Sequence, residues 1–316
     1  MKISFVIPCY GSENTLTIVV GEIKEKMKLM TQYEYEIILV NDCSPDGTLS
    51  VIRKLCREND NIIGISHAKN FGQHAALMAG FNFVSGDVVV CLDDDGQTPA
   101  SEVDKLLAKI EEGYDVVYAE YDNKQHSGFR NWGSHVNKKM TEVMLNKPKE
   151  LYVSSYFAAK RYIIDEILKY KGAYPYVIGL VLRTTKSICN VPVNHRKRLE
   201  GESGYTLKKL LGLWMNGFTS FSIIPLRIAS YSGSLIAFLG FIYAIYVIVR
   251  KIVDPTRMLG WSSTISVILI LGGLILLVLG LIGEYVGRIF ISINNSPQYV
   301  IKEVINYDGL GNSEKQ

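Results

Sequence analysis

Two long stretches without a charged residue near the carboxyl end of the chain restrict its folding more than any other feature. Residues 228–249 hold 22 consecutive uncharged positions, and residues 258–283 hold 26. A helix of that length crosses the ~30 Å hydrocarbon core of a bilayer. Buried core helices of a soluble domain are the alternative, but they are usually shorter. We therefore expect two transmembrane helices over 228–287, after a globular domain over 1–204.

The segment between the globular domain and the first span, residues 205–227, predicts an amphipathic helix. Its large apolar residues recur on one side, at Leu207, Leu210, Leu211, Trp214 and Phe218. Such a helix suits the membrane interface, although an ordinary packing helix fits the same spacing. Basic residues that suit anionic lipid headgroups gather nearby, at Arg196, Lys197, Arg198, Lys208, Lys209 and Arg227. The net charge of +3 is too small to indicate a nucleic-acid partner.

The amino-terminal run "MKISFVIPCY" predicts that the globular domain stays in the cytoplasm. Its apolar part is shorter than the core of a signal peptide, and Pro8 interrupts it. Two spans would return the predicted tail, 288–316, to the same side, in a multi-pass protein of the inner or plasma membrane. Glu284 and Arg288 could pair with each other or across a homo-oligomer. The five cysteines form no C-x-x-C pair, so we expect reduced thiols.

Residues 1–120 alternate short apolar runs with helical segments. Near-continuous Val and Ile runs separated by helices predict an α/β fold, with a mainly parallel sheet covered by helices on both faces. The expected strands are 3–8, 35–40, 61–66, 87–92 and 115–120, and the expected helices are 14–30, 48–58, 73–83 and 99–111. In such sheets, ligands bind beyond the carboxyl ends of the strands.

Three adjacent carboxylates, Asp93, Asp94 and Asp95, follow one of these strands in the run "VVVCLDDDGQTP". Side chains two apart on an extended chain point the same way, so Asp93 and Asp95 could face one site and Asp94 another. Two carboxylates held close repel each other unless a positive charge joins them. A Mg²⁺ or Mn²⁺ ion, bound by carboxylate and phosphate oxygens, would supply that charge. An ordinary acidic turn is the alternative.

Polar residues also follow the neighbouring strands. Asp42, after the run "IILV", could accept hydrogen bonds from a nucleotide base or ribose, although "SPDGT" is also typical of a turn that starts a helix. Lys69, Gln73 and His74 stand at a predicted helix start and could contact a base or a phosphate. His74 by itself is more typical of a surface or capping histidine.

A basic loop with glycines, "HRKRLEGESGY", follows residues 151–194, which predict mixed helix and strand and end at "SICNVPVNH". His195, Arg196 and Arg198 in this loop could clamp a phosphate, since the guanidinium fork matches phosphate oxygens. A basic patch against the membrane surface is the alternative. The two interpretations agree if the substrate is itself a lipid phosphate.

Seven motifs, taken in order, resemble a known family. They are "VIPCY", "IILVNDCSPDGT", "KNFGQHAALMAG", "DDDGQTP", "HRKRLEGESGYTLKKL", "FSIIPLRI" and "GLIGEYVGRIF". Their order, followed by two spans, is similar to that of family 2 glycosyltransferases with a GT-A fold. The chain resembles most closely the membrane-anchored polyprenyl-phosphate glycosyltransferases, such as dolichyl-phosphate mannose synthase and the bactoprenol glucosyltransferases. The resemblance covers about residues 2–300.

The resemblance implies a role for each matching residue. The nucleotide would be framed by Pro8, Tyr10, Glu13, Asp42, Lys69, Gln73 and Asp93. Asp95, together with Asp93, would hold Mg²⁺ or Mn²⁺, and Gln97 would lie beside the sugar or the acceptor. Arg196 and Arg198 would neutralise phosphates during catalysis. The donor would be a nucleotide sugar, UDP-linked in preference to GDP-linked. The acceptor would be undecaprenyl or another polyprenyl phosphate, with inversion at the anomeric carbon.

The chain departs from the family pattern around the expected sugar and acceptor. Gly11 and Ser12 stand where many members have Asn and Glu, and Gly96 replaces an apolar residue. Ser155 and Phe157 stand about where many bacterial members have Asp and Arg. The tail reads "SINNSPQY", without the Glu, Lys and Arg of the family motif. The identity of the sugar therefore stays open.

A phosphate acceptor would explain why the sequence offers no evident His–carboxylate pair. A hydroxyl acceptor needs a general base, whereas a phosphate monoester, with a second pKa of about 6, is already anionic at neutral pH. It needs placement and charge neutralisation instead. Two alternatives remain: transfer to a hydroxyl of a lipid-linked saccharide, and a non-catalytic membrane scaffold that binds a nucleotide sugar. Polymerising relatives usually carry more spans and a Q-x-x-R-W motif, which this sequence lacks.

Overall fold

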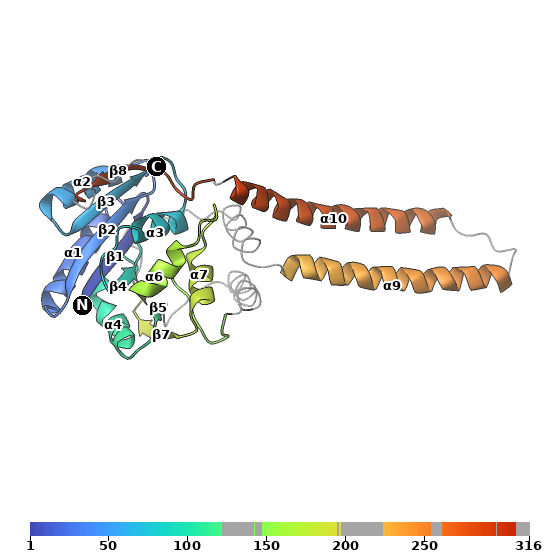
Figure 1. Cartoon of the computed structure of the whole chain (residues 1–316), viewed down its shortest axis with the longest axis horizontal. Helices are drawn as coiled ribbons and strands as arrows, with labels where there is room; N and C mark the ends of the chain where they lie inside the picture. The colour runs from blue at the N-terminus through green and yellow to red at the C-terminus, as the bar shows by residue number, and fades with distance from the viewer. Residues whose placement is uncertain are drawn as a thin grey trace. The chain divides into compact units, whose positions relative to one another are not determined.

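A computed structural model describes residues 1–121, 142, 147–194, 196, 224–253, 261–294 and 296–307 (Figure 1). The chain divides into two compact units, one made of Met1–Leu210 and Asn295–Gln316, and the other of Leu211–Asn294. Arg198 lies outside the described residues, as do His195 and the predicted interfacial helix up to residue 223.

The first unit is built on one mixed sheet. Within the described residues the sheet has 8 strands in the order β7-β5-β6-β4-β1-β2-β3-β8. The strands are β1 (Lys2–Cys9), β2 (Glu34–Asn41), β3 (Ile62–His67), β4 (Val88–Cys91), β5 (Val116–Tyr121), β6 (Phe157–Lys160), β7 (Ile188–Val193) and β8 (Ile301–Ile305). The central block β4-β1-β2-β3 is parallel, as the sequence predicts. β6 runs antiparallel to β4 and β5, and β8 runs antiparallel to β3, so the sheet is mixed.

The helices of this unit follow the predicted alternation. They are α1 (Leu16–Leu29), α2 (Thr48–Glu58), α3 (Gln73–Phe81), α4 (Val103–Glu111), α6 (Arg161–Leu168) and α7 (Val177–Thr184), with a 3₁₀ turn, η1 (Ala100–Glu102), before α4. The first of them shows why these segments are helical. Its buried residues, Leu16, Val19, Val20, Ile23 and Met27, recur every three or four positions and form one apolar stripe.

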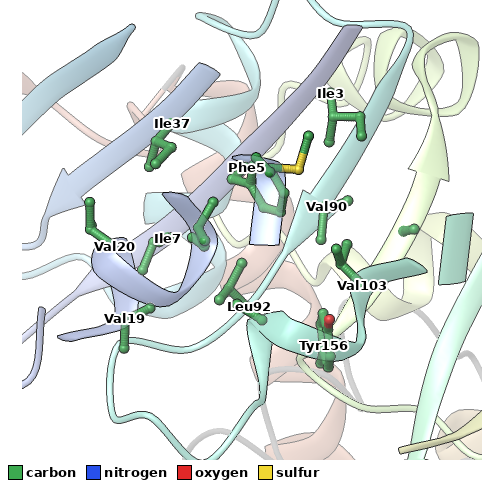
Figure 2. Packing of buried hydrophobic residues seen from close by; sticks show 14 of the residues in the cluster. Ile3, Phe5, Ile7, Val19, Val20, Ile37, Val90, Leu92, Val103 and Tyr156 are labelled. Atoms are coloured by element: carbon green, nitrogen blue, oxygen red, sulfur yellow. The ribbon is translucent and has the colours of Figure 1, made fainter. Parts of the chain in front are cut away.

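Alternate residues of β1 pack against helices on opposite faces of the sheet. Ile3, Phe5 and Ile7 join a core with Val19 and Val20 of α1 (Figure 2). On the other face α3 packs so closely that a Cβ atom at Gly80 would lie 2.5 Å from Val6 Cγ1. A strand covered on both faces reads as a continuous apolar run, and "ISFVIP" is such a run. The predicted two-sided α/β sheet is therefore confirmed for this block.

The segment after the second apolar helix returns to the first unit, which the sequence analysis did not predict. β8 pairs with β3 at the edge of the sheet, with Val304 opposite Ile65 (Figure 1). Arg53 of α2 binds Glu303 through Nε, at 3.2 Å, and through a terminal nitrogen, at 2.7 Å. The predicted cytoplasmic tail, 288–316, thus contributes a strand to the globular domain.

The second unit contains two long helices within its described residues, α9 (Ile224–Val253, 30 residues) and α10 (Trp261–Ile293, 33 residues). Within the described residues, one stretch, Ile270–Ile291, is long and apolar enough to cross a membrane, and Ala229–Tyr243 is a shorter apolar stretch. The two predicted helices are present. By length and composition, only one of the two predicted spans is supported in this part of the chain.

Candidate functional site at the carboxyl edge of the sheet

Four neighbouring parallel strands bring most of the predicted site residues together. The loops after β1, β2, β3 and β4 cover residues 10–15, 42–47, 68–72 and 92–99. We call these four loops the carboxyl edge. The chain leaves β1 toward β2 on one side, and β4 lies on the other, so a topological switch point falls between β1 and β4. In open α/β sheets this is the usual place for a ligand.

Asp93 is held by two neutral donors at this edge. Gln73 Nε2 donates to Asp93 Oδ1 at 2.9 Å, and Ser155 Oγ donates to Asp93 Oδ2. Burial raises the pKa of Asp93 to about 6, and the negative charges of Asp95 and Asp94 add to this, while the two hydrogen bonds oppose it. Within the described residues no cation pairs with Asp93, so a positive charge brought by a ligand would stabilise its ionised form.

Asp94 connects the ends of β4 and β1, a role that the sequence left unassigned. Its Oδ2 accepts a hydrogen bond from the Tyr10 amide at 2.9 Å, and its carbonyl oxygen accepts one from Thr15 Oγ1 at 2.6 Å. β4 ends at Cys91, so the three acids lie in a turn, where strand alternation does not apply. Asp94 does have different partners from Asp93. The reason is the conformation of the turn and not the alternation of side chains along an extended strand.

The turn that carries Asp95 also brings Arg196 to the carboxyl edge. Asp95 Oδ1 accepts from the Gln97 amide at 3.0 Å, and the Gln97 carbonyl accepts from the Arg196 amide at 3.2 Å. Gly96 between them has φ +72°, a left-handed conformation that glycine adopts at little cost. An L-residue at this position would be strained in the same conformation. The Arg196 guanidinium donates to Glu22 Oε1 at 2.5 Å. The phosphate contact predicted for Arg196 stays a prediction.

Asp42 is buried and fixes the loop that leads into α3. Its Oδ1 accepts from the Phe71 amide at 2.8 Å, and its Oδ2 accepts from the Gly72 amide at 2.7 Å. Gly72 has φ +90°, which is again the region that favours glycine. His67 Nδ1 lies 2.8 Å from Asp42 Oδ1. Asp42 therefore holds the 68–72 loop in place, and the direct nucleotide contact that the sequence predicts for it stays a prediction.

The structure also contains a His–carboxylate pair, His67 with Asp42, that the sequence did not reveal. The His67 side chain is 0% exposed, and its ring lies between Phe71, edge-on, and Tyr299, stacked. A base must reach the proton that it removes. Phe71 and Tyr299 separate the His67 ring from solvent, so the pair is a structural contact and not an accessible base.

Tyr10 and Lys69 are exposed residues among the predicted nucleotide contacts. Tyr10 is 54% exposed, while its backbone amide is held by Asp94. Lys69 is exposed, and its Nζ lies 4.9 Å from the centre of the Phe71 ring. These two side chains border the carboxyl edge and are available to a ligand.

Pro8 and Glu13 are engaged within the fold. Pro8 is a buried residue of β1. Glu13 Oε2 accepts from the Gly47 amide at 2.9 Å, and the Glu13 amide donates to Asp46 at 3.2 Å. Glu13 therefore ties the loop after β1 to the start of α2, and the nucleotide contact predicted for its side chain stays a prediction.

Comparison with known proteins assigns the chain to a family. Residues 4–168 match the profile of the family described as Glycosyl transferase family 2, and residues 224–289 match the profile described as GtrB C-terminal hairpin. Undecaprenyl-phosphate 4-deoxy-4-formamido-L-arabinose transferase of Yersinia enterocolitica is 33% identical over 317 residues, covering 99% of this chain and 97% of that protein. The chain belongs to glycosyl transferase family 2.

Other relatives agree with this assignment of a family 2 glycosyltransferase. Uncharacterized glycosyltransferase YkcC of Bacillus subtilis is 32% identical over 304 residues, covering 96% of this chain and 94% of that protein. Glucosyl-3-phosphoglycerate synthase from Mycobacterium tuberculosis, solved with Mn²⁺, UDP-glucose and phosphoglyceric acid, gives a TM-score of 0.51 at 20% identity, covering 67% of this chain and 75% of that chain. At that identity the likeness concerns the fold, a GT-A-like mixed α/β core.

The oxygen atoms at the carboxyl edge of this glycosyltransferase suit a divalent cation. Asp93 and Asp95 offer carboxylates, while Asp94 is turned to Tyr10. Among the described residues, no group of three or more His, Cys, Asp or Glu side chains is arranged to hold a metal. Mg²⁺ is commonly bound by one or two carboxylates with substrate phosphates completing the set. The donor atoms fit such an ion. Burial, and after it the charges of Asp95 and Asp94, raise the pKa of Asp93, and a bound cation would favour its ionised form.

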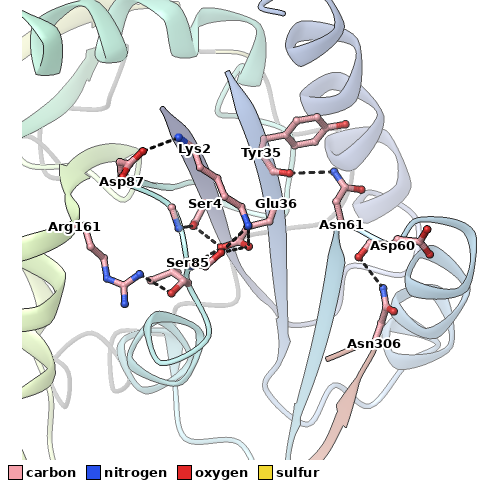
Figure 3. A network of polar contacts seen from close by, with 12 residues as sticks. Lys2, Ser4, Tyr35, Glu36, Asp60, Asn61, Ser85, Asp87, Arg161 and Asn306 are labelled. Carbon is pink, nitrogen blue, oxygen red and sulfur yellow. Dashed lines mark hydrogen bonds and ion pairs between the residues drawn. The ribbon is translucent and has the colours of Figure 1, made fainter. Parts of the chain in front are cut away.

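A second polar cluster of the glycosyltransferase lies at the opposite end of the strands, and we call it the amino edge (Figure 3). Glu36 is 6% exposed; it accepts from Ser4 Oγ and Ser85 Oγ, each at 2.6 Å, and pairs with Lys2 Nζ at 2.7 Å. Burial by itself would raise the pKa of Glu36, but the hydrogen bonds from Lys2, Ser4 and Ser85 lower it below its ordinary value. A cavity of about 480 Å³ borders this cluster, lined by Lys2, Tyr35, Glu36, Asp60, Asn61, Ile63, Asn306 and Tyr307. None of the predicted site residues lines it.

Proposed function

We propose that this family 2 glycosyltransferase moves a sugar from a nucleotide sugar to undecaprenyl or another polyprenyl phosphate at the cytoplasmic face of a membrane, with inversion at the anomeric carbon. The observation that carries the proposal is the placement of Asp93 and Asp95 at the end of β4, beside the loops after β1, β2 and β3. The name of the Yersinia enterocolitica relative, similar over nearly the whole chain, supports a polyprenyl-phosphate acceptor. UDP is the nucleotide that the family resemblance favours.

A lipid phosphate suits the chemistry of the carboxyl edge. Such an acceptor is already anionic, so it needs placement and neutralisation rather than a base. The His67–Asp42 pair is enclosed, which is compatible with a reaction that requires no proton removal. A divalent ion held by Asp93 and Asp95 would supply positive charge to the diphosphate as it departs. Gln73 and Ser155 would keep Asp93 oriented for that task.

Arg196 can exchange its present partner for a phosphate at low cost. Its pair with Glu22 is partly open to solvent, with side-chain exposures of 44% and 25%. Ion pairs of this kind contribute at most about 1 kcal/mol. A phosphate carries more charge than a carboxylate and matches the guanidinium fork. The hydrogen bond from the Arg196 amide to the Gln97 carbonyl would keep the residue beside the acidic turn during this exchange.

The decisive experiment tests donor and acceptor together. The purified full-length protein in lipid nanodiscs is incubated with polyprenyl phosphate, Mn²⁺ or Mg²⁺, and a panel of UDP- and GDP-sugars. We expect one lipid-linked monosaccharide phosphate by mass spectrometry, with a UDP-sugar as the donor and an inverted anomeric centre by NMR. No product from any donor, or a product only on a lipid-linked saccharide added as a second acceptor, would contradict the proposal. Donor binding without turnover would favour the scaffold alternative.

The proposal includes two membrane spans formed by α9 and α10, supported by the match of residues 224–289 to a C-terminal hairpin. Its test is labelling of single cysteines by a reagent that cannot cross the membrane, in a Cys43→Ser background. We expect a cysteine replacing Val253, at the end of α9, to be labelled from outside. A cysteine replacing the exposed Lys186 of the globular domain should react only after the membrane is opened. Equal labelling of both in intact cells would contradict the hairpin topology.

A further inference from the structure

The segment that follows α10 reaches the carboxyl edge through one aromatic residue. Tyr299 stacks flat on His67, with ring centres 5.6 Å apart and an interplanar angle of 9°. Its hydroxyl accepts from Asn82 Nδ2 at 2.8 Å, which fixes the ring at its far end. The neighbouring Val300 carbonyl accepts from the Ala68 amide at 2.9 Å. The segment therefore attaches to the loop after β3 through both side chain and backbone.

The stacked His67 ring passes this contact on to Asp42. His67 Nδ1 lies 2.8 Å from Asp42 Oδ1, and because an ionised carboxylate only accepts, this nitrogen carries the proton. Asp42 in turn accepts from the amides of Phe71 and Gly72. His67 Nε2 is buried with no hydrogen-bond partner in the described part of the chain. The ring is thus held by one hydrogen bond and two aromatic neighbours, and Tyr299 is the one that covers its face.

The loop fixed by Asp42 carries two residues of the donor site. Lys69 lies at its start, and Gln73, which begins α3, donates to Asp93 Oδ1 at 2.9 Å. A continuous series of contacts therefore runs from Tyr299 through His67 and Asp42 to the loop and Asp93. We propose that Tyr299 is a positioning residue for the nucleotide-sugar donor, acting through His67 and Asp42 on residues 69–73. This inference rests on the proposed function, because it takes the carboxyl edge to be the donor site.

The physical reason is the rigidity of the loop. Gly72 has φ +90°, and the hydrogen bond from its amide to Asp42 restrains it in that conformation. Without the restraint a glycine samples many other backbone conformations. Removal of the Tyr299 ring would expose the face of His67 and admit water to Nε2 and to the Asp42 carboxylate. Water would then compete for the bonds to the Phe71 and Gly72 amides. A looser loop must be ordered when the donor binds, which weakens binding.

The location of Tyr299 in the chain gives the inference a wider meaning. Tyr299 follows the end of α10, Ile293, after only a short segment. Residues 69–73 are therefore connected, through Tyr299 and the few residues before it, to a helix that we propose to be in the membrane. In this arrangement, the segment beyond α10 supports the active site through His67 and Asp42, although it lies more than 200 residues after Asp93 in the sequence.

The test compares two tyrosines of the same segment. Tyr299→Ala removes the ring on His67, Tyr299→Phe keeps the ring and loses only the hydroxyl, and Tyr307→Ala removes a ring that packs on Phe83, 5.0 Å away. In the transfer assay we expect Tyr299→Ala to raise the KM for the nucleotide sugar about tenfold, as for other misplaced positioning groups, with the KM for polyprenyl phosphate unchanged. Tyr299→Phe should stay within about twofold, because the ring remains. Tyr307→Ala should lower Tm without changing the donor KM.

Calorimetric titration with UDP and Mn²⁺ gives a readout independent of turnover, and the loss of affinity should match the rise in donor KM. If Tyr299→Ala does not fold, Tyr299→Leu keeps apolar volume without a flat ring and should shift the same two values in the same direction. The inference is overturned if folded Tyr299 variants bind UDP like the wild type, or if Tyr307→Ala raises the donor KM equally. Absence of transfer and of UDP binding in the wild type would instead refute the proposed function.

Discussion

The two ends of the central strands carry buried acids in opposite electrostatic states. At the amino edge, Glu36 is paired with Lys2 and hydrogen-bonded to two serines, and its pKa lies below the ordinary value. At the carboxyl edge, burial raises the pKa of Asp93 to about 6, and two acidic neighbours add to the shift, while the two neutral donors oppose it. We call the amino-edge cluster balanced, because Lys2 pairs with Glu36, and the carboxyl edge unbalanced, because no cation pairs with Asp93 within the described residues.

The difference separates a structural cluster from a functional one. Charge that is compensated within the protein holds the fold together and leaves nothing for a ligand to complete. Charge left uncompensated at a strand end lowers stability, so it persists where a ligand or a cation makes up the difference. By this criterion the carboxyl edge is the place to look for chemistry, although the 480 Å³ cavity lies at the amino edge.

The largest effect should come from the unbalanced edge. Asp95→Asn removes a carboxylate proposed to hold the cation, and we expect transfer to fall by at least about 100-fold, as when an electrostatic group that stabilises a transition state is removed. Tm should not fall, because one of three crowded acids becomes neutral. The matched control is Asp94→Asn, whose amide oxygen can still accept from Tyr10. Equal losses in both variants would mean that Asp95 has no special role.

The balanced edge should respond in stability and not in activity. Glu36→Gln removes the ion-pair partner of Lys2 and weakens the bonds from Ser4 and Ser85, so we expect the free energy of unfolding to drop by about 2 kcal/mol. The kcat of transfer should not change. Thermal unfolding in detergent and the transfer assay measure the two quantities. A stable Glu36→Gln protein with reduced transfer would reverse the assignment of the two edges.

The contribution of Glu36 should also depend on pH in a defined direction. The pKa of Glu36 in the folded protein lies below its unfolded value, so its stabilising effect is fully present above about pH 4.3, the ordinary Glu pKa. It is lost as the pH falls through that value and then through the lower native pKa. The difference in Tm between wild type and Glu36→Gln should therefore be constant from pH 7 to pH 5 and shrink below that. A constant difference down to pH 3 would contradict the balanced description.

Ser155 offers a smaller test on the unbalanced side. Ser155→Ala removes one of the two donors to Asp93, and we expect kcat/KM to fall about tenfold, which is typical when a residue that orients a ligand group is lost. Ser154→Ala is the matched control. Its hydroxyl binds the Ala119 and Tyr156 carbonyls and does not contact the acidic turn. A larger loss of activity in Ser154→Ala would argue against orientation of Asp93 by Ser155.

The smallest effect is expected where a balanced charge faces water. Glu303 of β8 pairs with Arg53, but their side chains are 34% and 42% exposed. Glu303→Gln should shift Tm by no more than about 2 °C, because solvent screens exposed pairs. Transfer should be unchanged. A shift as large as that of Glu36→Gln would show that burial is not what separates strong pairs from weak ones in this protein.

The sequence predicted the central strands and helices well because each is a nearly continuous apolar run or an amphipathic stripe. The helix expected at 48–58 is Thr48–Glu58, and the strand expected at 35–40 is Glu34–Asn41. β6 reads "FAAK" and β8 reads "IKEVI". These are short strands with remote partners, and nothing in their local pattern reveals the pairing. The sheet is mixed because of these two strands.

At the site, the sequence predicted which segments meet but not how their side chains are used. The strand-end argument correctly grouped Asp93 with Gln73. It could not predict that Asp42 would bind loop amides, since that depends on the conformation of residues 68–72. In the sequence, Ser155 stands out only as a departure from the family pattern. Its contact with Asp93 joins two segments that lie far apart in the sequence, so local pattern does not predict it.

The pairing of β8 with β3 has a consequence for how the protein is made. Residues 301–305 leave the ribosome only after both long apolar helices have been synthesised. Until then β3, which is buried along its whole length in the finished fold, has no neighbour on one side. Unpaired strand edges invite pairing with other chains, and partly folded domains are prone to aggregation. The residues beyond the two apolar helices therefore supply the second neighbour of β3, and until they are made that side of β3 is open to pairing with other chains.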